Sequence, residues 1–346
     1  MTERPSEPSP PSTSAKWPDT RSDVEADVDV DVEVEADVDV EADTRSDVEA
    51  DVDVDVDVDV DVEVEVEVEV EVDLDVAACL DEVTEMVRAS SAGSLQWYRR
   101  LDRIDNKSTA GFDPVTEADR AVESQLRAML GDRFPGHAIL GEEFGLSGRG
   151  RYRWVIDPID GTRAFITGQP MWGTLLGLQD RGVPVAGWMH LPVLDETYIG
   201  HRHCRFRADG ATTTINVSAT EELAEAIVLC THPSMFASGP EAERFASLAA
   251  AVKMVRYSGD CVNYGLLAMG LADLVVENGL AEYDIVPLIP IVESAGGVVT
   301  DLAGRPPVDG GYVVAAATPA LHAAALACLA EPAAPSPDGD LGTEGL

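Results

Sequence analysis

The sequence predicts an α/β protein in which the N-terminal half of the globular part is α+β and the C-terminal half is α/β. Between residues 173 and 200, apolar strand-like segments follow one another with only short turns between them, which is typical of an antiparallel meander. After residue 216, short strands alternate instead with helical segments. A long acidic tail of very different composition precedes both halves.

Changes in composition divide the 346-residue chain into four parts. Residues 1–76 form the acidic tail, residues 77–218 the α+β domain and residues 219–330 the α/β domain. Residues 331–346 are rich in Pro and Gly, and we expect them to form a flexible C-terminal tail.

The acidic tail consists mainly of an alternating Asp/Glu–Val repeat. The string TRSDVEADVDVDV occurs at residues 20–32 and again at residues 44–56, and residues 23–75 hold 26 acidic residues but a single basic one, Arg45. Paired strands of this sequence would set like charges opposite each other, and valine alone offers a thin core. We therefore expect a disordered tail without a catalytic role, with a cation-dependent strand or a partner-binding segment as the alternatives.

Of the formal net charge of −40, residues 23–75 carry −25, and the remaining −15 is acidic but ordinary for a soluble enzyme. Such a charge argues against binding to nucleic acid or to anionic membranes, and it suits a protein that holds cations. The five cysteines are widely spaced and form no C-x-x-C pair, which indicates a reduced protein rather than a disulfide framework or a zinc site. The N-terminus does not resemble a secretory signal, and no segment approaches the roughly 20 apolar residues that span a bilayer. We expect a cytoplasmic protein.

Two helices are predicted ahead of the meander. The first covers residues 77–101, where Leu80, Val83 and Val87 share one face and the pattern breaks near residues 90–94.

The second helix begins in the segment DPVTEADRAVESQLRAML. Thr116 is its N-cap candidate, and Val122, Leu126, Met129 and Leu130 follow the 3.6-residue period. The strands of the meander then follow as GTLLGLQ, VPVAGWMHL and ETYIG.

The C-terminal half contains five predicted strands, with the sequences AIVLCTH, KMVRYS, DLVVEN, GVVTD and YVVAAA. The helices predicted to alternate with them lie at about residues 241–251, 261–271, 284–294 and 319–329.

Five acidic residues stand at junctions between an apolar element and a turn, namely Asp119, Glu142, Asp157, Asp160 and Asp284. Glu142 follows a short strand in AILGEEFG, and Asp157 and Asp160 end another in WVIDPIDGT. Hard cations such as Mg²⁺ prefer oxygen ligands of this kind. The absence of His and Cys from these motifs disfavours zinc.

The loop that carries two of these carboxylates also offers a backbone ligand. Pro158 biases Asp157 towards an extended conformation, so that both aspartates and the carbonyl group of Ile159 can point to one side. Gly161 and Thr162 then open a segment that can turn helical, where free N–H groups suit the phosphate group of a substrate. The hydroxyl of Thr162 could also orient a water molecule.

Each of these residues also has a purely structural explanation. Asp119 fits a capping box with the threonine three residues before it, and the pair DG at Asp160–Gly161 is a common turn. Asp284 would be favoured by the helix dipole, and Asp260 could be the N-cap of the helix that follows it. The combination D-x-V-T-x-x-D, G-E-E, D-P-I-D-G-T and a late Asp, in this order, is what points to one shared site.

Residues 77–330 resemble the inositol monophosphatase family of Mg²⁺-dependent, lithium-sensitive phosphatases, and within it the histidinol-phosphate phosphatase branch. The matching segments are KSTAGFDPVTEADRAVE, GEEFG, WVIDPIDGTRAFITGQPMWGTLLGL and YSGDCVNYGLLAMGLADLVVENGLAEYDIVPLIPIVESAGG. The branch is indicated by GTRAFITGQPMWGTLL and by EYD, where inositol-cleaving members usually carry Trp-Asp. The resemblance implies a layered αβαβα sugar-phosphatase-like fold and a homodimer.

The resemblance also implies two or three Mg²⁺ ions in the site. Glu142, Asp157 and the carbonyl group of Ile159 would hold the first ion, and Asp157, Asp160 and Asp284 the second. Glu142 would also border a weaker third ion and the attacking water. The α+β domain would thus bind the metals, and the α/β domain would complete the active site.

Further residues acquire roles from the same resemblance. Thr162, hydrogen-bonded to Asp119, is similar to the dyad that activates the water molecule. Glu277, seven residues before Asp284, matches a substrate-contacting glutamate, although the neighbouring sequence NGLAEY departs from the inositol-cleaving pattern. Asp260 is a second candidate for contact with the cationic groups of histidinol phosphate.

We therefore expect an Mg²⁺-dependent phosphomonoesterase that hydrolyses histidinol phosphate to histidinol and phosphate, a step of histidine biosynthesis, by in-line attack of a metal-activated water. The alternative substrate is inositol phosphate or another small sugar or nucleotide phosphate. An alternative of a different class is a non-catalytic acidic protein that binds cations or a partner through its repeat tail.

Overall fold

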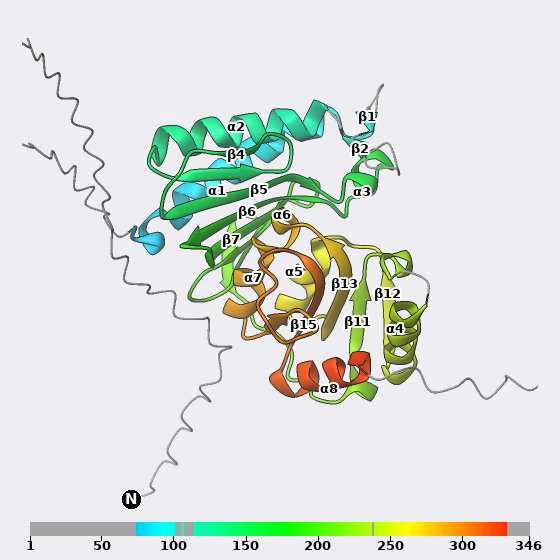
Figure 1. The fold of residues 1–346 in the computed structure, drawn as a ribbon. Coiled ribbons are helices and arrows are strands. Elements are labelled where there is room, and N and C mark those ends of the chain that lie inside the picture. The colour runs from blue at the N-terminus through cyan, green and yellow to red at the C-terminus, as the bar shows by residue number, and fades with distance from the viewer. Residues whose placement is uncertain (1–73, 101–104, 107–113, 116, 237–238, 331–346) are drawn as a thin grey trace, which may run out of the picture. The chain divides into compact units, whose positions relative to one another are not determined.

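The larger of two sheets has eight strands in the order β10-β9-β8-β7-β6-β5-β3-β4 (Figure 1). Its pairs are antiparallel except β3 with β5, which run parallel. The predicted meander is formed by β6, β7 and β8. The strands are β3 (Ala138–Gly141), β4 (Gly145–Ser147), β5 (Tyr152–Asp160), β6 (Gly173–Asp180), β7 (Val183–Leu191), β8 (Glu196–Gly200), β9 (Arg205–Ala208) and β10 (Ala211–Thr214).

The computed structural model describes residues 74–100, 105–106, 114–115, 117–236 and 239–330. The repeat tail up to residue 73, the C-terminal tail and the predicted N-cap Thr116 lie outside the described residues.

The smaller sheet has five strands in the order β12-β11-β13-β15-β14. β11 runs parallel to β12 and β13, whereas β15 is antiparallel to β13 and β14. Its strands are β11 (Ile227–Cys230), β12 (Met254–Tyr257), β13 (Leu274–Leu280), β14 (Val298–Thr300) and β15 (Gly311–Ala316), and a separate short pair joins β1 (Asp105–Asn106) to β2 (Pro114–Val115).

Two long helices, α1 (Val76–Ala92) and α2 (Glu117–Arg133), cover one face of the larger sheet (Figure 1). Their predicted apolar faces pack in one core cluster with Trp154 of β5 and Trp188 of β7, both of which are completely buried. The helix predicted for residues 77–101 ends earlier, at Ala92, and a 3₁₀ turn (Gly93–Gln96) follows.

A middle layer of short helices lies between the two sheets (Figure 1). It contains α5 (Val262–Ala268), α6 (Glu282–Ile285) and α7 (Leu288–Ser294). The single helix predicted for residues 284–294 is thus two helices, because Pro287 lacks the N–H that an uninterrupted helix would use.

The middle layer approaches the larger sheet closely because β7 and β8 present glycines to it. A Cβ atom added at Gly187 would lie 1.9 Å from the carbonyl oxygen of Pro287, and one added at Gly200 would lie 2.3 Å from the backbone nitrogen of Ile291. Only a residue without a side chain fits at either point. The same contact region is crossed by the ion pair of Arg153 with Glu282, which joins β5 to α6.

The outer face of the smaller sheet is covered by α4 (Pro240–Ala251) and α8 (Pro319–Ala330), which were predicted within one or two residues. The alternation of layers is therefore helix, sheet, helix, sheet, helix, which confirms the predicted layered α/β class (Figure 1). The remaining short elements are α3 (Thr162–Ile166) and the 3₁₀ turns Leu223–Glu225 and Pro233–Met235.

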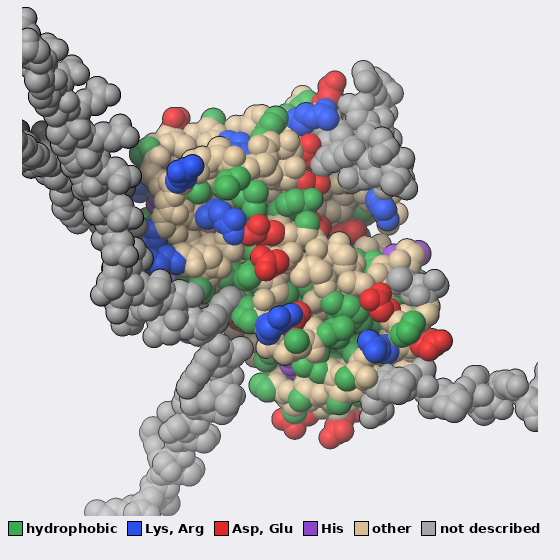
Figure 2. Space-filling model, viewed as in Figure 1, with side chains coloured by type: hydrophobic (Ala, Val, Ile, Leu, Met, Phe, Trp, Pro, Cys, Tyr) green, Lys and Arg blue, Asp and Glu red, His purple; other side chains and the backbone are tan. Residues whose placement is uncertain are grey.

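Surface charge, helix length and the state of the cysteines can be compared with the expectations from the sequence. On the face shown in Figure 2, basic and acidic side chains are interspersed rather than gathered by sign. Within the described part of the chain, none of the helices combines the length and the apolar character needed to cross a membrane. All five cysteines are free thiols, and four of them are buried.

Candidate active site and metal centre

The end of β5 brings two aspartates to the centre of the molecule. Pairing between β5 and β6 shifts register between Asp157 and Asp160, where Pro158 has no N–H to donate. The carbonyl group of Pro158 accepts a hydrogen bond of 2.8 Å from the buried hydroxyl of Thr174 on β6, which holds the irregular segment in place. Both aspartates thereby stand at the C-terminal end of β5.

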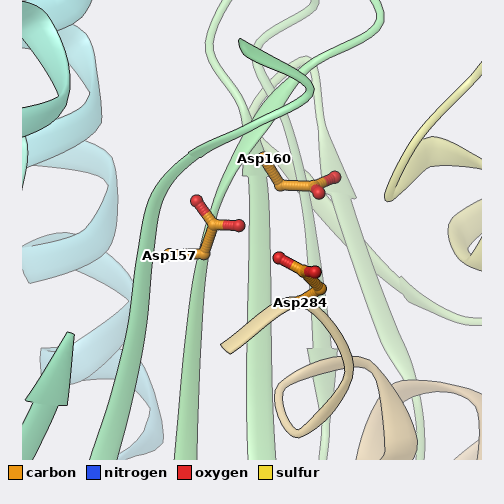
Figure 3. Close-up of side chains that lie close together, drawn as sticks. All are labelled: Asp157, Asp160 and Asp284. Carbon is orange, nitrogen blue, oxygen red and sulfur yellow. The ribbon is translucent and has the colours of Figure 1, made fainter. Parts of the chain in front are cut away.

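Asp284 reaches the same place from α6, which lies more than a hundred residues further along the chain. One of its carboxylate oxygens accepts a hydrogen bond of 2.7 Å from the backbone N–H of Ala281, as in a capping box. Ligand oxygens of Asp157, Asp160 and Asp284 all lie within 4.8 Å of one another. Figure 3 shows the three side chains converging on one space. Three of the five predicted acidic residues are therefore brought together.

The carboxylates form an electrostatically costly group. Asp157 is 2% exposed, and its Oδ1 atom has no hydrogen-bond partner among the described residues. Burial, followed by the charges of Glu142, Asp160 and Asp284, raises the pKa of Asp157 well above its usual value. Burial and the charges of Asp260 and Asp284 likewise raise the pKa of Asp160. A bound cation would offset this repulsion, since buried charges are stable only when paired or coordinated.

Glu142 lies directly after β3, beside the strand that carries the aspartates. Its N–H group donates to the carbonyl oxygen of Ile156 at 3.2 Å, which continues the parallel pairing of β3 with β5 by one step. Its charge contributes to the raised pKa of Asp157. Among the described residues, the group whose ligand atoms lie within 4.8 Å of one another does not include Glu142.

The turn after Asp160 adopts a conformation that requires glycine. Gly161 has a φ of +85°, and an added Cβ atom would lie 3.0 Å from the carbonyl oxygen of Met171. The hydroxyl of Thr162 donates to the carbonyl oxygen of Ile159 at 3.1 Å, so one lone pair of this predicted metal ligand is already in use. Asp119 is 1% exposed in the first turn of α2, and its hydrogen bond with Thr162 stays a prediction.

A cavity of about 420 Å³ opens beside the carboxylates. Asp160, Gly161, Thr162, Asp260 and Asp284, all predicted from the sequence, contribute to its lining. Arg163, His232 and Asn278 also line it and were not predicted. His232 and Asn278 stand at or just beyond the carboxyl ends of the parallel strands β11 and β13, a position where ligand-binding residues gather in α/β sheets and which could have signalled them.

Asp260 lies in a strained segment at the wall of the cavity. Its φ is +46°, and its N–H group donates to the hydroxyl oxygen of Thr231 at 3.1 Å. Burial, followed by the charge of Glu277, raises the pKa of Asp260 to about 7, against the opposing charge of Arg163. Asp260 is therefore an acidic group at the cavity wall that a cationic ligand would favour in its charged form.

Glu277 is almost fully enclosed by hydrogen-bond donors. One carboxylate oxygen accepts from the N–H and the hydroxyl of Thr231, at 3.0 and 2.6 Å, and from the amide of Asn263 at 3.3 Å. The other accepts from the hydroxyl of Tyr264 at 3.1 Å. Glu277 therefore fixes Thr231, which lines the cavity, and the contact of Glu277 with a substrate stays a prediction.

The raised pKa of Asp260 predicts a pH-dependent stability. A carboxyl group with a folded-state pKa near 7 stabilises the fold fully below its unfolded pKa of about 4, and this contribution is lost as the pH rises towards 7. In EDTA, we expect the Tm of Asp260→Asn relative to the parent to be higher at pH 8 than at pH 4.5. Asparagine tolerates the positive φ, so the backbone should not change. Calorimetry at the two pH values checks this, and an equal difference at both would contradict it.

Comparison with known proteins identifies the class of this chain as a phosphatase. The chain belongs to the inositol monophosphatase family, whose profile matches residues 74–333.

Individual relatives agree with this assignment. A histidinol-phosphatase of Mycobacterium tuberculosis is 40% identical over 220 residues, which are 62% of this chain and 83% of the relative. The chloroplastic bifunctional phosphatase IMPL2 of Arabidopsis thaliana is 38% identical over 211 residues. These are 60% of this chain and 59% of the plant protein, so this chain spans less than two thirds of that relative. A solved inositol monophosphatase of Zymomonas mobilis is 35% identical, with a TM-score of 0.63 over 73% of this chain and 96% of that one.

Proposed function

We propose that this phosphatase is an Mg²⁺-dependent enzyme that hydrolyses histidinol phosphate to histidinol and phosphate. The observation that carries the proposal is the group formed by Asp157, Asp160 and Asp284, whose ligand atoms lie within 4.8 Å of one another beside a cavity of about 420 Å³. The donor set consists of oxygen atoms alone, which suits a hard cation such as Mg²⁺. The partnerless Oδ1 atom of Asp157 fits a metal ligand better than it fits a structural carboxylate.

Each residue of the site has a proposed part in holding two or three ions. Glu142, Asp157 and the carbonyl group of Ile159 would hold one ion, and Asp157, Asp160 and Asp284 another. When bound, such ions supply positive charge that reduces the repulsion between a phosphate dianion and its nucleophile and favours ionisation of a water molecule. The family is metal-dependent, and this chain retains an acidic cluster that suits the same use.

The chain's own residues then orient the reactants. Glu142 and the hydroxyl oxygen of Thr162 would hold the attacking water in line with the ester bond. For this the Thr162 hydroxyl, which donates to Ile159 in the free site, would turn its hydrogen to Asp119, so that the proton of the water passes through Thr162 to the Asp119 carboxylate. The backbone N–H groups at Gly161 and Thr162 bind phosphate oxygens at the start of α3. Attack on phosphorus breaks the bond to the alcohol oxygen, which takes up a proton from a neighbouring water in place of the one that the attacking water gives up, and no covalent intermediate with the protein forms.

The choice of histidinol phosphate rests on the wall of the cavity. Histidinol carries an ammonium group and an imidazole, and Asp260 offers an acidic group beside the phosphate position. The identity of 40% to the mycobacterial histidinol-phosphatase, against 30–32% to curated inositol monophosphatases, agrees with this choice. Inositol 1-phosphate is the second candidate, since the solved inositol monophosphatase of Zymomonas mobilis aligns with 73% of this chain.

Phosphate release from a panel of esters tests the proposal. The full chain should release phosphate from histidinol phosphate with a higher kcat/KM than from inositol 1-phosphate or glycerol 2-phosphate, and EDTA should abolish release in all three. Lithium provides a second test, because it should inhibit phosphate release at a constant Mg²⁺ concentration. A higher kcat/KM for inositol 1-phosphate would overturn the substrate. Metal-independent release would overturn the mechanism.

A further inference from the structure

We propose that Glu123, held by Arg127, is a positioning residue for Glu142 and thereby sets the affinity of the site for its metal. The inference rests on the proposed function insofar as it takes Glu142 to be a ligand. Neither Glu123 nor Arg127 lines the cavity. Both belong to α2, and Glu123 lies one helical turn after the buried Asp119, on the same face.

The carboxylate of Glu123 is bonded to the turn that follows Glu142. One oxygen accepts a hydrogen bond of 2.7 Å from the backbone N–H of Glu143, and the other accepts one of 3.2 Å from the N–H of Phe144. These groups belong to the tight connection from β3 to β4, where strand pairing offers them no partner. The side chain of Glu123 is 0% exposed, so the two bonds form out of water, where a charged acceptor binds strongly.

Arg127 completes this arrangement from the next turn of α2. Its Nε atom donates to Glu123 at 2.7 Å, and its other nitrogens donate to the hydroxyl of Ser147 at 2.8 Å and to the carbonyl oxygen of Gly145. The guanidinium therefore neutralises the buried carboxylate and bonds the far side of the same turn. With a longer bond of 3.4 Å from Arg127 to the carbonyl oxygen of Ile139, helix α2 thus holds the β3–β4 hairpin by five hydrogen bonds.

The carboxylate of Glu123 also packs against β3. A Cβ atom added at Gly141 would lie only 2.0 Å from its Oε1 atom, so the carboxylate lies directly against the backbone at the end of β3. Glu142 is consequently fixed on both sides. Its own N–H is bonded to Ile156 of β5, and the N–H of the next residue is bonded to Glu123. A shift of this turn would move the carboxylate of Glu142 relative to Asp157, which lies on the neighbouring strand β5.

The test compares Glu123→Gln, Arg127→Met and a matched control, Asp180→Asn. Glutamine keeps the shape of Glu123 but loses the charge that holds Arg127. Asp180 forms a more exposed ion pair with Arg151, at the opposite end of β5 from the site. Titration calorimetry of the folded proteins with Mg²⁺ alone gives the metal affinity without reference to turnover.

We expect Glu123→Gln to weaken Mg²⁺ binding about 10-fold, as outer partners of metal ligands do, and Arg127→Met about 3-fold. The Mg²⁺ concentration for half-maximal activity should rise by the same factors, while the KM for histidinol phosphate at saturating Mg²⁺ stays within about twofold of the parent. Asp180→Asn should lower Tm and leave the metal affinity unchanged. A purely structural role for Glu123 would lower Tm alone.

A reference variant, Glu142→Gln, separates this inference from the proposed function. If Glu142→Gln binds Mg²⁺ weakly but Glu123→Gln binds with the parental affinity, the positioning role is wrong and the assignment of Glu142 stands. If Glu142→Gln itself binds with the parental affinity, Glu142 is not a ligand, and both are overturned. Should Glu123→Gln fail to fold, Arg127→Met decides, since it leaves both backbone hydrogen bonds to Glu123 in place.

Discussion

Replacement of Asp157 by Asn is expected to lower kcat for phosphomonoester hydrolysis by about 1,000-fold or more without loss of the fold. The variant keeps the shape of the side chain but removes a charge that two ions would share. A loss of about 4 kcal/mol in transition-state stabilisation corresponds to this factor. Full activity of the variant would contradict the assignment of the site.

The same substitution should stabilise the metal-free protein, although it lowers activity. Because burial and neighbouring carboxylates raise the pKa of Asp157, the folded state disfavours its charged form, and stability is lost as the pH rises above the usual Asp value. In EDTA at pH 8 the Asn variant should therefore have a higher Tm than the parent. Added Mg²⁺ should raise the Tm of the parent more than that of the variant. Calorimetry with and without Mg²⁺ measures both, and a lower Tm of the variant in EDTA would count against the repulsion.

Replacement of Gly187 by Ala is expected to cost about 3 kcal/mol in the free energy of unfolding. The added methyl group would lie 1.9 Å from the carbonyl oxygen of Pro287, and neither backbone can move alone. Denaturant titration measures the loss. Gly131→Ala is the matched control, since nothing lies within 4 Å of its added Cβ atom in α2 and alanine favours a helix.

The functional consequence of the glycine contact distinguishes it from an ordinary packing defect. Pro287 lies between α6 and α7, three residues after Asp284. A displacement of this segment would move Asp284 away from Asp157 and Asp160, so Gly187→Ala should also weaken Mg²⁺ binding. An unchanged free energy of unfolding in Gly187→Ala would show that the two layers are not in firm contact at this point.

Much of the fold could be predicted because its periodic patterns are local. The apolar faces of α1 and α2 and the alternating strands of the meander follow from spacing along the chain alone. The division of residues 284–294 into α6 and α7 was missed, although Pro287 signalled it. The early end of the helix at Ala92 was also missed, since the break near residues 90–94 was treated as an interruption and not as the end.

The site could be predicted in part for a similar reason. Asp157 and Asp160 share one short motif, and strands and turns place them without reference to the rest of the chain. Arg163 directly follows Thr162 and was overlooked, whereas His232 reaches the cavity from a separate strand, β11, and only its place beyond the carboxyl end of that strand could have signalled it. Glu123 and Arg127 stand four residues apart on α2, a spacing that by itself fits an exposed ion pair, and only the turn after β3, packed over them, buries the carboxylate.

The carboxylates of the site come from two different layers of the molecule. Asp157 and Asp160 belong to the larger sheet, whereas Asp284 belongs to the helices between the sheets. An ion shared by these residues would therefore act as a reversible crosslink between the layers, in addition to the glycine contacts and the Arg153–Glu282 ion pair. By thermodynamic reciprocity, any ligand that separates the layers must weaken the binding of the ion by the same free energy by which the ion disfavours their separation.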